Sequence, residues 1–313
     1  MPNLLTHSFF AIEAYNNFLN SEELGFKIDF EAFKLGSVGP DPLFYGGVSV
    51  TSLHPLLALK KMGNKIHKSD NKTITFAYDS NLTLMSENEE KKNLLKSFYL
   101  GQLAHYILDS TTHPYIYYWS GFDDEGHLTG HYHYRHAHFE ACIDSSICYI
   151  KKETSYIKNP KSMIKIGSED LKIISECYVQ VLESFFGYKI PKFYYKGAVN
   201  NMLRFASLAN KKTKAFAIGP LKKMRNPNKF HEEVFNLNHL EWRHPATGEK
   251  SNKTFIDLYQ EALNKFSMCL NEFKKNQSIF EAYSILESEI DFEGKKIGTV
   301  KKYKDTSETL YSE

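Results

Sequence analysis

Histidine is concentrated in one short stretch of this chain. Seven of its 13 histidines fall between His105 and His138, although the chain has 313 residues. Proton transfer and metal binding are the usual tasks of an imidazole, so the concentration needs a chemical explanation. The pattern of residues around these histidines is therefore the most informative feature of the sequence.

Two pairs of residues in this stretch have helical spacing. His105 and Asp109 are four positions apart inside the most strongly periodic predicted helix. Residues with this spacing project from one helix face, one turn apart, so the pair can chelate a metal ion. His136 and Glu140 repeat the arrangement, and Asp144, one turn further on, is placed to orient a ligand imidazole. Two such helices can face each other.

Most of the remaining chain is also predicted to be helical. Apolar residues recur every three to four positions within residues 4–18, 52–62, 89–109, 131–151, 168–186 and 253–274. Strands are scarce, so we expect an all-α, multi-helical single domain over residues 1–288. Residues 289–313 are predicted to be a C-terminal hairpin or extension. The polar stretch 64–93 is predicted to be a surface segment without a chemical role.

Composition and charge make several classes of protein less favoured, although nucleic acid as a partner is not excluded. The net charge is only +2 with mixed signs, which provides no broad basic surface for nucleic acid. The four cysteines form no Cys-x-x-Cys motif and are expected to be reduced. No stretch is long and apolar enough for a transmembrane segment, and the first ten residues lack the features of a signal peptide. A soluble, cytoplasmic protein is expected.

Further residues of the types that bind metals lie outside the two helical pairs. They are His7, Asp41, His54 and His113. Neutral imidazoles and carboxylates together suit Zn²⁺, whose catalytic sites leave one position for water. A single His-x-x-x-Asp pair is more often a solvated ion pair on a helix surface, so only the whole set favours a metal centre.

In order and spacing, these residues resemble the family of zinc-dependent phospholipases C and their S1/P1 nuclease relatives. The resemblance covers His7 to Asp144 and rests on Thr6–Phe10, Gly39–Asp41 with His54, Gly101–Asp109, and His136–Glu140 with Asp144. Residues 238–249 also resemble a segment of clostridial-type members, although a structural loop that caps the next helix explains them better.

The resemblance implies two or three zinc ions and a set of ligands. The implied ligands are His7, Asp41, His54, His105, Asp109, His113, His136 and Glu140, with Asp109 bridging two ions. His138 is an alternative to His136. His113 departs from the pattern of the secreted lipases, in which the corresponding histidine lies two residues after a proline, because here it precedes Pro114. The family also uses the amino terminus of the mature chain. Removal of Met1 would expose the amine of Pro2 for this purpose.

The resemblance also implies a phosphodiester hydrolase in which a metal-activated hydroxide attacks phosphorus. Asp109 would bridge the metals, and Asp41 would bind metal and orient the nucleophile. The substrate would be a phosphodiester, with a phospholipid as the first candidate. The aromatic residue by which the family recognises choline is missing, because Pro42 follows Asp41. An S1/P1-like nuclease and a non-catalytic helical metal-binding protein are the alternative interpretations.

Overall fold

The chain folds almost entirely into helices. The computed structural model describes residues 4–19, 24–46, 57–84, 88–152, 162–212 and 227–306. Its α-helices are α1 (Leu4–Ala14), α2 (Phe30–Ser37), α3 (Leu57–His67), α4 (Lys72–Leu84), α5 (Glu89–Ser120), α6 (His131–Lys152), α7 (Ser168–Phe186), α8 (Tyr194–Lys212), α10 (Pro227–Val234), α11 (Phe255–Asn276) and α12 (Ile279–Ser284). A π-helical turn covers Tyr15–Leu19, and a 3-10 turn covers Asp41–Tyr45. Two short antiparallel strands, β1 (Trp242–Arg243) and β2 (Lys250–Ser251), complete these elements. The predicted all-α fold is confirmed.

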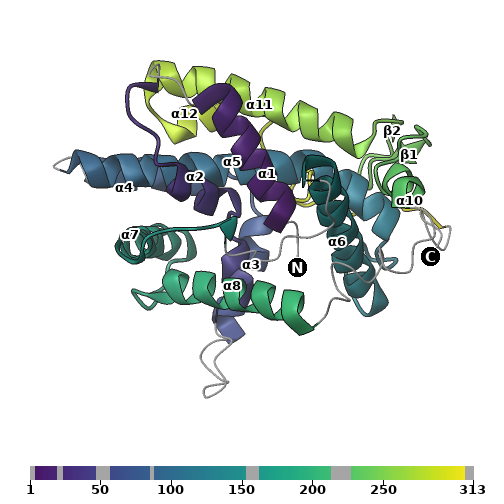
Figure 1. The fold of residues 1–313 in the computed structure, drawn as a ribbon, viewed down its shortest axis with the longest axis horizontal. Coiled ribbons are helices and arrows are strands. Elements are labelled where there is room, and N and C mark those ends of the chain that lie inside the picture. Colours follow the sequence, from purple (N-terminus) through teal and green to yellow (C-terminus); the bar gives the residue numbers. More distant parts are fainter. Residues whose placement is uncertain are drawn as a thin grey trace.

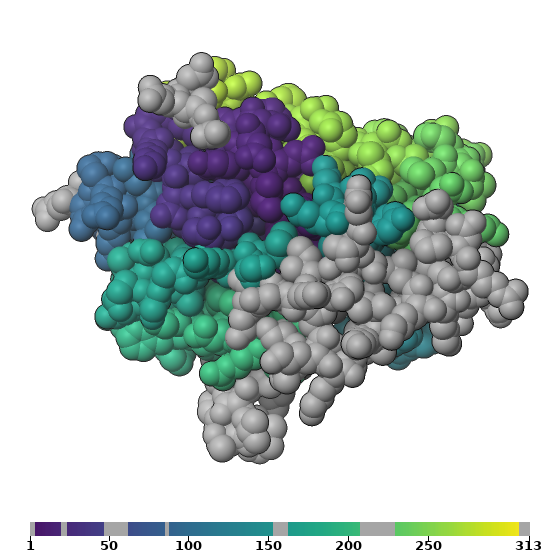
Figure 2. All heavy atoms as spheres, viewed as in Figure 1, coloured from purple at the N-terminus to yellow at the C-terminus, as the bar shows by residue number. Residues whose placement is uncertain are grey.

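Helix α5 lies at the centre of the molecule (Figure 1). Helices α1, α2, α6, α7 and α11 all pack against it, and most of its residues after Leu94 are buried. On the face shown in Figure 2, α1 (purple) and α11 (yellow-green) meet over this core. A helix that is covered on all sides can place polar side chains in the interior of the protein, provided that they find partners there.

Helix α5 continues to Ser120, beyond its predicted end at Asp109. Pro114 lies inside it and removes one main-chain hydrogen bond, which costs about 3 kcal/mol in a helix interior. Tyr115 and Ile116 are completely buried, and each large apolar side chain contributes about 1.5–3 kcal/mol when buried. The helix therefore continues because tertiary packing outweighs the local cost of the proline.

Two glycines allow α2 to approach α5 closely. A Cβ atom on Gly36 would lie 2.9 Å from the Cα of Gly101, and a Cβ atom on Gly101 would lie 2.3 Å from the main-chain oxygen of Phe33. Neither position tolerates a side chain without a shift of the backbone. This contact brings the loop after α2, which contains Asp41, over the middle of α5.

The prediction that residues 64–93 form a surface segment is wrong. Helix α3 continues to His67, and α4 places Ile74 and Tyr78 in the hydrophobic core. The polar residues of this stretch obscured the helical spacing of its buried ones. Residues 52–56, at the start of the predicted helix 52–62, lie outside the described residues.

The segment after α12 folds back over the helices. It forms isolated bridges between Ile290 and Lys296 and between Asp291 and Asp70. Asp291 and Phe292 are buried, so this segment contributes to the interior of the protein. Among the described residues, no helix is both long and apolar enough to cross a membrane.

Candidate metal centre

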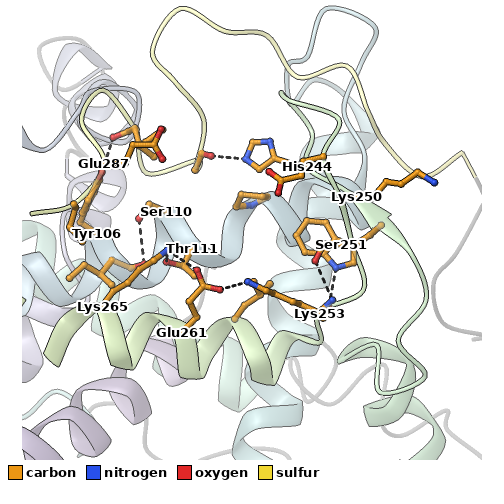
Figure 3. Close-up of a pocket in the computed structure, with 18 residues that line it drawn as sticks. Tyr106, Ser110, Thr111, His244, Lys250, Ser251, Lys253, Glu261, Lys265 and Glu287 are labelled. Atoms are coloured by element: carbon orange, nitrogen blue, oxygen red, sulfur yellow. Dashed lines mark hydrogen bonds and ion pairs between the residues drawn. The ribbon is translucent and has the colours of Figure 1, made fainter. Parts of the chain in front are cut away.

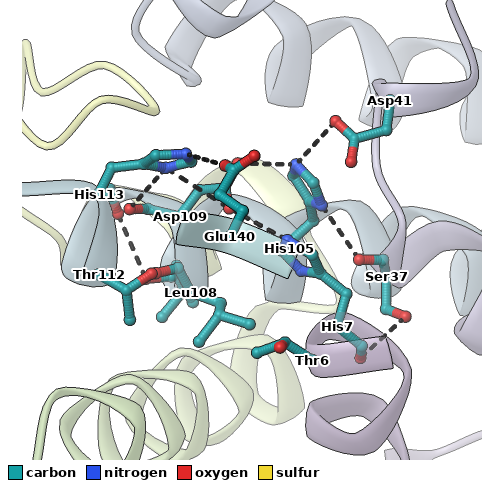
Figure 4. A network of polar contacts seen from close by, with 12 residues as sticks. Thr6, His7, Ser37, Asp41, His105, Leu108, Asp109, Thr112, His113 and Glu140 are labelled. Atoms are coloured by element: carbon teal, nitrogen blue, oxygen red, sulfur yellow. Dashed lines mark hydrogen bonds and ion pairs between the residues drawn. The ribbon is translucent and has the colours of Figure 1, made fainter. Parts of the chain in front are cut away.

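Helix α5 presents three candidate ligands on successive turns. His105, Asp109 and His113 are spaced four residues apart, and their exposed fractions are 0%, 3% and 8%. They project from one helix face toward α1, α6 and the loop after α2 (Figure 4). Buried groups of this kind require compensating partners, and the neighbouring elements supply them.

The first donor group consists of His7, Asp41, His67 and His105 around the Asp109 carboxylate. Nε2 of His7 lies 3.1 Å from Oδ1 of Asp109, and Nε2 of His105 lies 3.0 Å from Oδ2. Nε2 of His67 lies 3.2 Å from Oδ1 of Asp41 and 3.8 Å from Oδ2 of Asp109. The rings of His7 and His105 stack with their centroids 4.1 Å apart. Helices α1, α3 and α5 thus each bring a histidine to this carboxylate, and Asp41 joins the group through His67 and His105.

The second donor group consists of His113, His136 and Glu140. Oε1 of Glu140 lies 3.2 Å from Nε2 of His136 and 3.5 Å from Nε2 of His113. The two imidazole rings are nearly parallel, with centroids 5.8 Å apart. Nδ1 of His113 also lies 3.6 Å from Oδ1 of Asp109, so this carboxylate lies between the two donor groups.

Main-chain carbonyl groups orient three of these imidazoles, one of them His113, whose Nδ1 lies 3.2 Å from the carbonyl oxygen of Asp109. Nδ1 of His105 lies 3.1 Å from the carbonyl oxygen of Ser37, and Nδ1 of His67 lies 2.8 Å from that of Gly63. A carbonyl group can only accept, so each Nδ1 donates the hydrogen and each neutral ring presents an unprotonated Nε2 to the carboxylates. This is the tautomer that binds a metal through Nε2.

Gly39 allows the loop to pass directly over His105. Its φ is +55°, in the left-handed region, and a Cβ atom there would lie 2.3 Å from the ring of His105. Any other residue would therefore be strained by its backbone conformation and would also displace the imidazole. Gly39 precedes Pro40 and Asp41, so the same turn covers the His105 ring and carries Asp41, a candidate ligand of the first donor group.

The expectation that Asp144 orients a ligand imidazole is wrong. Its carboxylate accepts hydrogen bonds from the main-chain N–H groups of Leu5 and Thr6, at 3.1 and 2.9 Å, and from the Thr6 hydroxyl at 2.6 Å. These are the unpaired donors of the first turn of α1. Asp144 thus holds the start of α1, and its influence on His7 is exerted through that helix.

The charges of the centre stabilise one another. Burial by itself raises the pKa of Asp109, but His105, His113 and His7 hold it well below its ordinary value. The pKa of Glu140 is likewise lowered against the effect of burial by His136 and His113. Burial lowers the pKa of His113, but Asp109 and Glu140 raise it to about 10. Without a metal, the proton held by His113 provides positive charge beside both of these carboxylates.

The donor set fits zinc. The ligand atoms within each of three groups, His7–Asp41–His105, His67–His105–Asp109 and His113–His136–Glu140, lie within 4.8 Å of one another. Imidazole nitrogens and carboxylate oxygens are the ligands of catalytic zinc sites. Among the described residues, nothing hydrogen-bonds to the buried Nδ1 of His7. The centre therefore has the donors, the burial and an unused nitrogen that a cation would require.

The structure brings together seven of the nine predicted ligands. They are His7, Asp41, His105, Asp109, His113, His136 and Glu140. Pro2 and His54 lie outside the described residues. His136 is the histidine that faces Glu140, whereas the His138 ring packs against Tyr134, and its Nδ1 lies 3.8 Å from the Cys142 sulfur.

Sequence reasoning missed His67. It lies in a polar stretch, and the helix that contains it is predicted to end at Met62. The available signal is that Ile66 continues the apolar spacing of Met62 past Gly63. Extending the helix by this residue would have placed His67 at its end, but would not have shown that its side chain points toward Asp41.

Residues 238–249 form a structural loop, as predicted, but they do not cap the next helix, because the N-cap of α11 is Thr254. His244 donates from Nε2 to the Gly294 carbonyl at 2.8 Å, and its Nδ1 accepts from the main-chain N–H groups of Ala246 and Thr247. Each of these imidazole nitrogens already has a partner within the loop or the C-terminal segment. His244 therefore tightens the turn between β1 and β2.

A cavity of about 460 Å³ lies beside another face of α5, between this loop, α11 and the segment after α12 (Figure 3). Its lysines are ion-paired: Lys250 with Glu241 at 3.0 Å, and Lys253 and Lys265 with Glu261 at 2.6 and 3.0 Å. The residues of α5 that line it are Tyr106, Ile107, Ser110, Thr111 and Pro114. The cavity is thus separate from the metal centre and has balanced charges.

The fold and the buried His/carboxylate centre define a helical protein whose residues are arranged to hold metal ions. The sequence model of the family described as "Zinc dependent phospholipase C" matches residues 6–190, more than half of the chain. The chain therefore belongs to this family and is a zinc-dependent hydrolase of the phospholipase C type. Neither the curated proteins nor the solved structures include a match to it.

Proposed function

We propose that the protein hydrolyses phosphodiesters with zinc ions held on both sides of Asp109. The observation that carries this proposal is the position of the Asp109 carboxylate, with Oδ2 beside His105 and Oδ1 beside His7 and His113. Both oxygens therefore face histidines of the first donor group, and Oδ1 also faces His113 of the second, so this one carboxylate lies where it could serve metals on both sides. Asp41, His7, His67 and His105 would hold the metal on one side, and His113, His136 and Glu140 would hold that on the other.

Bound zinc would supply a Lewis acid that activates water and neutralises the phosphoryl oxygens. The protein's own residues would position the reaction. Asp109 would keep the two sites close, and Asp41 would orient the nucleophile with the carboxylate oxygen that is not bound to metal. The burial of Asp109 and His105 would strengthen every charge interaction there, because little water screens it.

The proposed substrate is a phospholipid. Phe44 follows Asp41 in the same 3-10 turn, and its ring lies 5.1 Å from that of His67. Phe44 and Tyr45 are only half-buried, so they offer aromatic surface beside the first donor group. Such surface suits an acyl chain or a quaternary ammonium head group.

A combined metal and activity assay tests this function. Purified protein should contain zinc, lose activity on dialysis against a chelator and regain it with zinc. Phosphatidylcholine vesicles, a soluble bis(nitrophenyl) phosphate and single-stranded DNA should be compared as substrates. Preferred hydrolysis of phosphatidylcholine is expected. Preferred cleavage of DNA would instead indicate a nuclease, and zinc-loaded protein without activity on any of the three would refute hydrolysis of these phosphodiesters.

A further inference from the structure

The C-terminal segment after α12 packs against α5 and approaches both donor groups. It lies beyond residues 6–190, which the family model matches. The Tyr106 hydroxyl of α5 donates to the Ile290 carbonyl at 2.8 Å, and the main-chain N–H of Phe292 donates to the His67 carbonyl at 3.2 Å. The segment is therefore attached to α5 and to the end of α3, two elements that supply candidate ligands.

The tip of this segment is a rigid turn. The Asp291 carboxylate accepts hydrogen bonds from the main-chain N–H groups of Glu293 and Lys295, and pairs with the Lys295 ammonium at 2.6 Å. Gly294 has φ +73°, and a Cβ atom there would lie 2.4 Å from the Ser110 carbonyl oxygen. The turn thus lies directly against α5, and its conformation is held by its own hydrogen bonds.

Phe292 contacts the first donor group. Its ring lies 5.0 Å from that of His67 and 5.9 Å from that of His105, and it is buried. Since Phe44 also lies 5.1 Å from His67, this imidazole has aromatic neighbours in two separate segments. Packing of this kind limits the rotation of the ring about its Cβ–Cγ bond.

Glu293, the next residue, acts on the second donor group through Tyr117. Its Oε1 accepts a hydrogen bond from the Tyr117 hydroxyl at 2.9 Å, and the Tyr117 ring lies 4.6 Å from that of His136. Lys301 pairs with Oε2 of Glu293 at 2.6 Å and lies 4.0 Å above the Tyr117 ring. A half-buried acid, a buried lysine and a buried tyrosine thus form one connected network beside His136.

We propose that Phe292 and Glu293 form a positioning clamp for the metal centre, in which Phe292 holds His67 and Glu293, through Tyr117, holds His136. The proposal rests on the proposed function, because both histidines are taken as metal ligands. Phe292 and Glu293 are adjacent in one rigid turn, so the clamp ties the geometry of one donor group to that of the other. Residues that orient metal ligands in this way commonly contribute about 10–100-fold to metal affinity or activity.

Two conservative substitutions test the clamp. Phe292→Leu removes the ring contact with His67 and keeps most of the apolar volume. Tyr117→Phe keeps the ring beside His136 and removes the hydrogen bond to Glu293, whose charge stays paired with Lys301. Ile297→Ala is the matched control, because Ile297 belongs to the same segment and is 46% exposed.

Zinc affinity, the visible absorption spectrum of the cobalt-loaded protein, kcat and KM should be measured for each variant. The thermal midpoint of the zinc-free protein shows whether folding is affected. Both clamp variants should bind zinc about 10–100-fold more weakly, with an altered cobalt spectrum and a lower kcat at similar KM. Ile297→Ala should match the wild type in all of these.

The outcomes separate the clamp from the proposed function. Wild-type affinity and an unchanged cobalt spectrum in both variants would refute the clamp, even if the enzyme is active. Altered affinity and spectrum in a protein that hydrolyses no phosphodiester would support the clamp and refute the proposed function. A wild-type protein with no affinity for zinc or cobalt would overturn both.

Discussion

Oδ1 of Asp109 lies 3.1 Å from Nε2 of His7, although the two residues belong to different helices at the centre of the molecule. The other carboxylate oxygen of Asp109 faces His105, and His113 lies on the side of Oδ1. One carboxylate therefore links α1 to three turns of α5. The following predictions concern this linkage and the residues that support it.

Replacing Asp109 with Asn should remove the metal ions from both donor groups. The neutral amide lacks the negative charge that would balance two cations, so zinc content should fall. The value of kcat/KM should drop at least about 100-fold, which is the upper range for residues that only orient ligands. Elemental analysis and phosphodiesterase assays check this. Asp124→Asn is the control, because Asp124 is fully exposed and should tolerate the change. Full zinc content in Asp109→Asn would disprove the bridging role.

Replacing His67 with Ala should weaken metal binding at the first donor group. His67 is the imidazole nearest to Asp41, so its loss removes a ligand there and zinc affinity should decrease by about 10–100-fold or more. Competition with a chromophoric chelator measures this affinity. His127→Ala is the control, because the His127 side chain is 58% exposed and lies in a loop. Equal affinity in the two variants would remove His67 from the ligand set.

Replacing Gly39 with Ala should displace His105. The new methyl group would meet the imidazole ring, and the backbone would also carry about 1–2 kcal/mol of left-handed strain. Gly187→Ala is a matched control, since Gly187 has φ +73° and a Cβ atom there would have no neighbouring atom within 4 Å. Gly39→Ala should lose more stability than Gly187→Ala in urea unfolding, because it adds a clash with a buried ring to the same backbone strain, and it alone should lose zinc. Retained zinc in Gly39→Ala would show that the ring tolerates the methyl group.

The zinc-free protein should lose stability as the pH rises from neutral. The pKa of His113 is about 10 in the folded state against an ordinary 6.5, because Asp109 and Glu140 outweigh burial. A raised pKa contributes stability that is complete below pH 6.5 and is lost as the pH rises through about 10. Urea unfolding across this range measures the loss.

The same proton gives zinc binding the opposite dependence on pH. Zinc must displace the proton from His113, so zinc affinity should rise over the range in which the stability of the zinc-free protein falls. His113→Asn should flatten the fall in stability of the zinc-free protein. A stability of the wild-type protein that stays constant between neutral pH and about pH 10 would contradict the shifted pKa of His113.

The helical pairs could be predicted because their geometry is local. Four residues make slightly more than one helical turn, so His105 and Asp109, and likewise His136 and Glu140, share a face in any helix of this sequence. The histidine concentration and the spacing of apolar residues were enough to place these pairs within helices. Resemblance to a family then added His7, Asp41 and His113.

His67 and Asp144 could not be assigned in this way. The position of His67 depends on where α3 ends and on a hydrogen bond to Gly63, and that of Asp144 depends on which helix start lies beside it. Phe292 is further still along the chain from the ligands that it contacts. These relationships arise from packing between distant segments, and no periodicity of a single segment encodes them.

By itself, the sequence determined the two helices that carry the His/carboxylate pairs, the faces on which these pairs lie and the chemical type of the donors, because each depends on spacing of a few residues. Only the tertiary structure decided which faces meet. The close contact of Gly36 with Gly101 brings Asp41 over α5, and the cap from Asp144 holds α1 with His7 in place. The convergence on Asp109 follows from these contacts, because they fix where each helix lies relative to α5.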